Sequence, residues 1–209
     1  MLSDIERVRG TYGRLASSYD RSASRWDFLL RLDRGRRWVC ERAQGRVLEV
    51  GIGTGLSLAH YRDGAHLTGL DATPEMLTIA GRRAAELGKE VDLRLGDAEA
   101  LEFSDASLDT VVFTYSLCTI PDPQRSLAEA HRVLRPGGTL LLTEHVRSPN
   151  PIVRGGQRLL DPLFQWLEAD HLLREPLTSV RALGFVVAEL ERSALGIMER
   201  LRATKPAAS

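Results

Sequence analysis

Three glycines at alternate positions follow a short apolar run that carries a carboxylate. The run at 47–50 contains Glu49, and Gly51, Gly53 and Gly55 come directly after it. Because glycine has no Cβ, such a turn lets a ligand lie almost against the backbone, and the free N–H groups of a following helix favour electron-rich ligand atoms. The sequence therefore predicts a strand, a tight turn and a helix start that together hold a large polar ligand.

Two further carboxylates follow the next two apolar runs. Asp71 ends the run at 66–71, and Asp97 comes just after the run at 91–95. A carboxylate at the end of a second strand can accept hydrogen bonds from both hydroxyls of a ribose. Ligands of open parallel sheets bind at the carboxyl ends of the strands, so we expect Glu49, Asp71 and Asp97 to point to one site.

The spacing of the glycines disfavours two common nucleotide-binding motifs. A dinucleotide fingerprint, G-x-G-x-x-G, needs a glycine at the position that Leu56 occupies here, so the spacing is G-x-G-x-G. No P-loop lysine follows the turn either. A nicotinamide dehydrogenase is therefore disfavoured, although a glycine turn by itself is also found where no ligand binds.

The elements that must hold these residues alternate between strand and helix. β-rich runs separated by segments of helical period predict a parallel sheet with crossover helices. Pro74 and Pro123 stand at first helical positions, after Thr73 and Asp122 as capping residues. The expected strands are 47–50, 66–71, 91–95, 108–114 and 139–144, and the expected helices between them are 56–61, 74–87 and 123–134.

The segments outside this alternating region predict a cap, a lid and a terminal hairpin. Helices are expected at 3–18, with Ser3 as N-cap, and at 25–43, so that residues 1–45 cover one end of the fold. Residues 147–176 interrupt the rhythm with a helical lid, in which Asp161-Pro162 can restart the helix. Pro136-Gly137-Gly138 should break the chain before the strand at 139–144. A helix at 177–183 and strands at 185–190 and 197–204 complete a seven-stranded sheet with a terminal antiparallel hairpin.

Composition restricts the partners of the chain. Its 209 residues suit one domain, and 28 Lys and Arg balance 28 Asp and Glu, so nothing indicates nucleic acid. Cys40 and Cys118 form neither a disulfide framework nor a metal-ligand pattern, which favours a cytoplasmic protein without a metal. No apolar run approaches the roughly 20 residues that span a bilayer, so we expect at most peripheral membrane contact. A monomer and a homodimer are equally compatible with the sequence.

Taken together, these motifs resemble those of the class I S-adenosylmethionine-dependent methyltransferases. The segment 49–55 resembles the first motif of that family, 70–77 the second and 96–99 the adenine-side motif. The segments 117–123 and 132–138 are similar to its later motifs, in the right order. The resemblance covers residues 12–144 and implies a Rossmann-like, doubly wound α/β domain over residues 46–209, with helices on both faces of a mostly parallel sheet.

The resemblance also implies how S-adenosylmethionine lies. Its methionine part follows the glycine turn, its ribose binds Asp71, and its adenine lies beside Asp97. Tyr12 and Tyr19 resemble aromatic residues that close over the cofactor in relatives with a similar N-terminal helix. Such a protein mainly aligns the nucleophile with the methyl group and excludes water, and no metal is needed. The cofactor-binding residues expected are Tyr19, Glu49, Gly51, Gly53, Gly55, Asp71, Ala72, Met76, Asp97, Ala98 and Thr114.

The acceptor side is expected after the fourth and fifth strands. Tyr115 and Cys118 follow the fourth strand and would face the transferred methyl, and His145 follows the fifth. A histidine there can take a proton from an amine, a thiol or a hydroxyl near neutral pH. His145 and Tyr115 are therefore the candidate catalytic residues, with a hydrogen-bonded structural role as the alternative for His145.

The segment 157–174 resembles one found in alkyl-thiol methyltransferases of animal membranes and in small bacterial phospholipid N-methyltransferases. Asp170 stands where the animal relatives carry a cysteine. The resemblance implies methyl transfer to N, S or O of a small, partly apolar acceptor, such as an amine, a thiol or a lipid headgroup, with S-adenosylhomocysteine as the product. The alternatives are carbon methylation of a quinone-like ring and a non-catalytic regulator that binds the cofactor.

Overall fold

A mixed seven-stranded sheet forms the centre of the protein. The computed structural model describes residues 3–207, without the side chains of Arg25, Phe28 and Leu29. The strand order is β3-β2-β1-β4-β5-β7-β6, and the pairs are parallel except that β7 runs antiparallel to β5 and β6. This confirms the doubly wound α/β fold and its antiparallel end. The strands are β1 (Arg46–Val50), β2 (His66–Asp71), β3 (Asp92–Leu95), β4 (Leu108–Thr114), β5 (Leu134–His145), β6 (Val186–Ser193) and β7 (Met198–Thr204).

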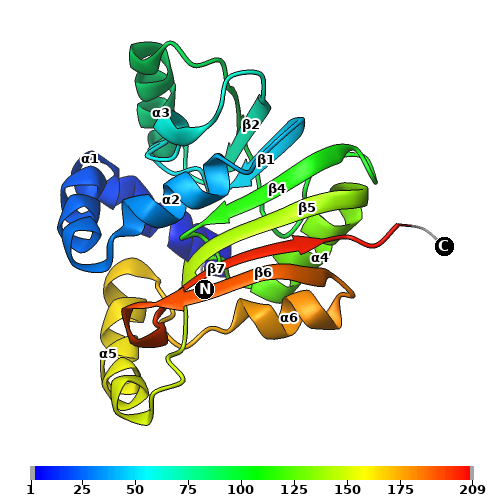
Figure 1. The fold of residues 1–209 in the computed structure, drawn as a ribbon. Coiled ribbons are helices and arrows are strands. Elements are labelled where there is room, and N and C mark those ends of the chain that lie inside the picture. The colour runs from blue at the N-terminus through cyan, green and yellow to red at the C-terminus, as the bar shows by residue number, and fades with distance from the viewer. Residues whose placement is uncertain (1–2, 208–209) are drawn as a thin grey trace.

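Helices cover both faces of this sheet and one of its ends. In Figure 1, α1 and α5 lie at the end toward which β4 points, where the carboxyl ends of the parallel strands meet. They fall in the segments expected to form the cap and the lid, and these two roles stay predictions. The helices are α1 (Asp4–Leu30), α2 (Leu32–Cys40), α3 (Pro74–Leu87), α4 (Pro123–Val133), α5 (Pro151–Glu168) and α6 (Pro176–Ala182), with short 3-10 turns η1 (Leu58–His60) and η2 (Ala194–Gly196).

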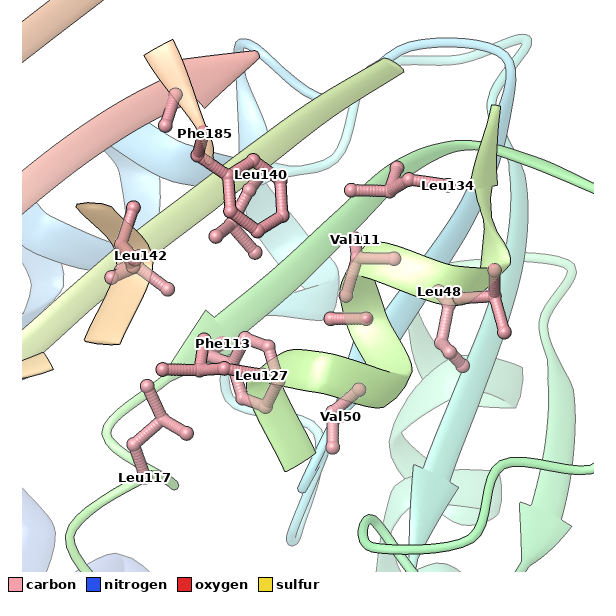
Figure 2. Packing of buried hydrophobic residues seen from close by; sticks show 14 of the residues in the cluster. Leu48, Val50, Val111, Phe113, Leu117, Leu127, Leu134, Leu140, Leu142 and Phe185 are labelled. Carbon is pink, nitrogen blue, oxygen red and sulfur yellow. The ribbon is translucent and has the colours of Figure 1, made fainter. Parts of the chain in front are cut away.

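Two hydrophobic layers hold the sheet between its helices. Because successive strand residues point to opposite faces, Val111 and Phe113 of β4 pack toward Leu127 of α4, as Figure 2 shows, whereas Val112 packs on the other face with Val39 of α2. All five side chains are fully buried. Burial on both faces fixes the central strands, so the residues just beyond their carboxyl ends have a rigid support.

The cap differs from the two helices expected at 3–18 and 25–43. One helix, α1, runs without interruption from Asp4 to Leu30, and the chain turns at Arg31, whose φ of 55° is left-handed. Its start is as predicted, with Ser3 and Glu6 forming a capping box. The stretch after Tyr19 contains no proline or glycine that would stop a helix. The break expected there was therefore wrong.

Three further boundaries differ from the sequence-based expectation. The helix expected at 56–61 is only the short turn η1, and β5 begins at Leu134, so Pro136-Gly137-Gly138 lies inside the strand as an irregularity in its pairing with β4. Helix α5 continues through Pro162 instead of restarting there. Asp122 caps α4 as predicted, but the side chain of Thr73 makes no capping hydrogen bond to α3.

Within residues 3–207, no helix is both long and apolar enough to cross a membrane.

Candidate functional site

A cleft opens at the carboxyl ends of the first parallel strands. It lies between the glycine turn after β1, the ends of β2 and β3, and the first turns of α1. Of the residues expected to bind the cofactor, those that line the cleft are Tyr19, Gly51, Gly53, Asp71, Ala72, Met76, Asp97 and Ala98. The structure thus brings the predicted ribose and adenine residues together in one place.

The glycine turn leaves room for a ligand against its backbone. Gly51 and Gly53 have φ values of 73° and 57°, which disfavour any residue with a Cβ. A Cβ on Gly51 would also lie only 2.5 Å from Cβ of Ser116, whereas a Cβ on Gly53 would meet no atom within 4 Å. The space beside Gly53 is therefore part of the cleft, as a ligand lying along the turn requires.

The carboxylate of Asp71 is held by two backbone N–H groups. Oδ2 accepts a hydrogen bond from Gly53 N at 2.9 Å, and Oδ1 accepts one from Thr73 N at 2.9 Å. Burial raises the pKa of Asp71, and these hydrogen bonds oppose that rise. A carboxylate has about four lone-pair sites, so Asp71 keeps two that can accept hydrogen bonds from a ligand. Asp97 is fixed similarly, since its Oδ1 accepts from Glu99 N at 2.8 Å.

Three residues expected to bind the cofactor do not line the cleft. Glu49 is 1% exposed, and its Oε2 accepts a hydrogen bond from Ser57 Oγ at 2.7 Å. Burial raises its pKa to about 7. Gly55 packs against Leu58 and Ala80, and the Thr114 hydroxyl is buried without a hydrogen-bond partner among the described residues. Glu49 fails to reach the cleft because alternation along β1 turns its side chain toward the interior below the glycine turn.

An ion pair fastens α1 to the glycine turn. Asp20 accepts a hydrogen bond from the Thr54 hydroxyl at 2.6 Å and pairs with Arg83 of α3, which also donates to the Thr54 carbonyl at 2.7 Å. The sequence does not reveal this group, because its members are far apart in the chain. Asp20, Thr54 and Arg83 thus hold α1 beside the cleft.

A second, mainly apolar cavity of about 380 Å³ adjoins the cleft. Tyr12, Tyr19 and Tyr115 line both cavities, and the first two rings meet edge to face with 6.1 Å between their centroids. These three tyrosines form the junction between the cavities. Helix α5 supplies much of the remaining wall, through Val153, Gly156, Gln157, Leu160, Phe164 and Glu168.

His145 and Asp170 form a hydrogen-bonded pair in the wall of the second cavity. His145 Nε2 lies 2.9 Å from Asp170 Oδ1, and each side chain is only about 15% exposed (15% and 13%). Burial alone would lower the pKa of His145, but the charge of Asp170 and the hydrogen bond to it outweigh burial, so this pKa is raised. For Asp170, burial opposes the effect of His145, and the net pKa is lowered. Because the carboxylate accepts from Nε2–H, Nδ1 is the nitrogen left with a free lone pair.

The loop that follows β4 is held from two sides. Glu144 Oε1 accepts hydrogen bonds from Ser116 N and Leu117 N, both at 2.9 Å. Arg174 donates to the carbonyls of Leu117 and Ile120. The loop passes between the two cavities, so these buried contacts fix the junction.

Tyr115 occupies a strained position at this junction. Its φ is 54°, its hydroxyl donates to the Leu32 carbonyl at 2.8 Å, and the guanidinium of Arg36 lies 5.2 Å from the ring centroid. Burial raises the pKa of its hydroxyl to about 12. With this geometry, the ring of Tyr115 is better suited to positioning a ligand than its hydroxyl is to transferring a proton.

One group of metal-ligating residue types occurs among residues 3–207. Sγ of Cys118 and one ligand atom each of His145 and Asp170 lie within 4.8 Å of one another. Each has a hydrogen-bonded partner, since Cys118 donates to the Tyr115 carbonyl at 3.5 Å and the other two bind each other. Burial holds the pKa of Cys118 well above its ordinary value, so its sulfur stays a thiol. These hydrogen bonds explain the group as a histidine–aspartate pair that shares a proton and lies next to a thiol.

Comparison with known proteins identifies related chains. The family described as "Methyltransferase domain" matches residues 48–142. A demethylmenaquinone methyltransferase of Clavibacter sepedonicus is 30% identical over 228 aligned positions, which cover 96% of this chain and 91% of that protein. A phosphatidylethanolamine N-methyltransferase of Cereibacter sphaeroides is 42% identical over 111 residues, and a thiol S-methyltransferase of Rattus norvegicus is 32% identical over 154.

The extent of these matches differs. The match to the phosphatidylethanolamine N-methyltransferase covers 52% of this chain and 55% of that protein, and the match to the thiol S-methyltransferase covers 69% and 62%. A solved methyltransferase structure from Thermotoga maritima superposes with a TM-score of 0.70 over 95% of this chain and 99% of that one. At 23% identity it shows the fold alone.

Asp71 provides a direct test of the cleft. Asp71→Ala should weaken S-adenosylmethionine binding at least about tenfold in calorimetry, because a hydrogen bond to a charged group is worth roughly 1.5–3 kcal/mol. Asp105→Ala is the matched control, since its carboxylate is 79% exposed and pairs with Arg132 outside the cleft. Equal affinities for wild type and Asp71→Ala, with both folded by circular dichroism, would contradict the assignment.

Proposed function

We propose that this protein, which belongs to the S-adenosylmethionine-dependent methyltransferases, methylates nitrogen, sulfur or oxygen of a small, partly apolar acceptor. The observation that carries the proposal is the second cavity, which is mainly apolar, meets the cofactor cleft at three tyrosines and contains the His145–Asp170 pair. An apolar cavity with few polar groups selects an acceptor that is largely hydrocarbon and fixes its one reactive end.

The cleft residues divide the binding of the cofactor among them. We assign the ribose hydroxyls to Asp71, the adenine to the region of Asp97 and Ala98, and the methionine part to the backbone beside Gly53. The fit rests on the lone pairs that Asp71 keeps and on the open space beside Gly53. Asp20 contributes indirectly, because it holds α1, and therefore Tyr19, over the cleft.

The protein's part in the reaction is alignment and proton removal. The cofactor supplies an electrophilic methyl group on a sulfonium. The junction tyrosines direct the acceptor toward it along one line and keep water out. Nδ1 of His145 takes the proton that the acceptor loses, while Asp170 fixes the ring and stabilises the imidazolium that forms. Both carboxyl groups near the junction, Glu144 and Asp170, favour positive charge there.

Two other readings differ in the acceptor or in the chemistry. Carbon methylation of a quinone-like ring is favoured by the extent of the match to the demethylmenaquinone methyltransferase, which spans 91% of that relative. A ring hydroxyl would then lose its proton to His145. A regulator without catalysis is disfavoured, because the second cavity is open rather than filled by side chains.

The His145–Asp170 pair predicts a specific pH dependence. The base must be neutral, and its pKa is raised, so kcat/KM should increase with pH through a midpoint above the ordinary histidine value. Asp170→Asn removes the charge that raises this pKa, so burial then dominates and the midpoint should move to lower pH while kcat falls. Asp105→Asn, which changes an exposed carboxyl outside the cavity, is the control and should leave the midpoint in place. An unchanged profile in Asp170→Asn would refute the assignment of the base.

The acceptor class is identified by a screen. Amines, thiols, phenols, phosphatidylethanolamine and reduced quinones, each with short and long alkyl chains, are compared for conversion of S-adenosylmethionine to S-adenosylhomocysteine. We expect turnover with N, S or O acceptors, increasing with alkyl length as the second cavity fills. Methylation only at ring carbon of the quinones would favour the alternative, and preference for the shortest acceptors would contradict the role of the cavity.

A further inference from the structure

Helix α5 turns a broad apolar surface outward. Ile152, Leu159 and Trp166 are 85%, 81% and 74% exposed, far more than large apolar side chains of a folded domain usually are. Three further side chains of the helix are about half exposed, namely Leu160, Leu163 and Leu167. We call these six side chains the α5 surface.

The α5 surface is continuous and contains no charge. At about 100° per residue its members fall within an arc of about 120° on the helix, which is the width of a complete apolar face. Arg158 lies about 80° beyond one edge of this arc, whereas Arg154 lies on the far side of the helix, opposite the centre of the arc. Neither forms an ion pair with a described carboxylate. The helix is therefore apolar on the outside, and Arg158 is the nearer of its two arginines to the apolar face.

The opposite side of α5 is firmly attached to the domain. Gln157 accepts from Ser148 N at 2.8 Å and donates to the Val146 carbonyl at 2.9 Å, and Asp161 accepts from Leu172 N at 2.7 Å. Asn150 caps the first turn. These contacts leave little freedom for the helix to rotate its apolar face inward, so the outward orientation belongs to the fold.

The α5 surface is also connected to the acceptor cavity. Leu160 belongs to both. Phe164, on the adjacent side of the helix, lines the cavity, and its ring centroid lies 6.1 Å from that of Trp26 in α1. Trp26 is itself 41% exposed. An apolar path therefore leads from the outer surface of α5 across its edge to the second cavity. In Figure 1, α1 and α5 lie next to each other at this end of the molecule.

We propose that α5 lies in the headgroup region of a phospholipid bilayer and that the second cavity receives its acceptor from the lipid. An amphipathic helix with Trp, Ile and Leu on one side is the arrangement that partitions into a bilayer interface, and Arg158, the nearer of the two arginines to that side, can meet lipid phosphates there. The apolar path from the α5 surface into the second cavity fits an acceptor that comes from the lipid, whereas a protein partner gives that path no purpose. The part concerning the acceptor rests on the proposed function, whereas the bilayer contact does not.

Vesicle flotation tests the bilayer contact. The full chain is mixed with vesicles of phosphatidylcholine alone or with about one third phosphatidylglycerol, and we expect binding that is stronger to the anionic vesicles. Leu159→Ser/Trp166→Ser should weaken binding about tenfold or more, because it removes two of the three most exposed side chains of the α5 surface. Arg158→Gln should lose about fivefold on anionic vesicles, since one arginine near the surface contributes about 1 kcal/mol there.

Matched controls lie on other faces of the molecule. Leu87→Ser/Val186→Ser removes two exposed apolar side chains from α3 and β6, and Arg82→Gln removes an exposed cation from α3. These variants should bind vesicles like the wild type. Binding that is equal in all variants, or none with either vesicle, would overturn the proposal. So would a dimer, detected by light scattering, that Leu159→Ser/Trp166→Ser dissociates without any vesicle binding, because the α5 surface would then join two copies.

Delivery from the lipid is tested separately with two acceptors of one chemistry. Leu159 and Trp166 do not line the cavity, so the double variant should methylate a dissolved short-chain acceptor at the wild-type rate but lose at least about fivefold with the same headgroup on long chains in vesicles. An equal loss of methylation rate with both acceptors, or no loss with either, would overturn lipid delivery. Vesicle binding that depends on α5, without methylation of any acceptor, would instead contradict the proposed function and leave the bilayer contact standing.

Discussion

The hydrogen bond from the Gly53 N–H to Asp71 joins the ends of two strands, and the cofactor cleft depends on it. It fixes a left-handed glycine turn after β1 against the carboxyl end of β2, at 2.9 Å between nitrogen and oxygen. The turn can stay open beside Gly53 only because the sheet beneath it is packed on both faces. Asp71 is thus a structural tie, and it is also the group that we propose binds the ribose.

The residues that we propose face the acceptor lie at the ends of the neighbouring strands β4 and β5 and are held in a different way. Glu144 and Arg174 hold the loop after β4 through its backbone, which places Tyr115 between the two cavities. His145 is the last residue of β5 at the same sheet edge, and it lines the apolar cavity, where burial strengthens its interaction with Asp170. One rigid edge therefore supports both the polar cleft, where we propose that the cofactor binds, and the apolar cavity, where we propose that the acceptor binds.

The sequence predicts the part of this arrangement that is local. The strands, the prolines that begin α3 and α4, and the glycine turn follow from neighbouring residues, and Asp71 and Asp97 follow from their places at strand ends. What depends on distant contacts escapes prediction. The pairing of His145 with Asp170 and of Asp20 with Arg83 joins residues 25 and 63 positions apart. Some local features were also mispredicted, since α1 runs on past Tyr19, α5 continues through Pro162, and Glu49 is buried instead of lining the cleft.

A crystal structure with S-adenosylhomocysteine and a methylated short-chain acceptor tests the central claim, that two cavities meet where the methyl group is transferred. The account predicts the thioether sulfur at the junction of Tyr12, Tyr19 and Tyr115, with the methylated atom between that sulfur and His145 and the alkyl chain in the second cavity. A sulfur remote from the junction, or an acceptor bound outside the second cavity, would contradict it.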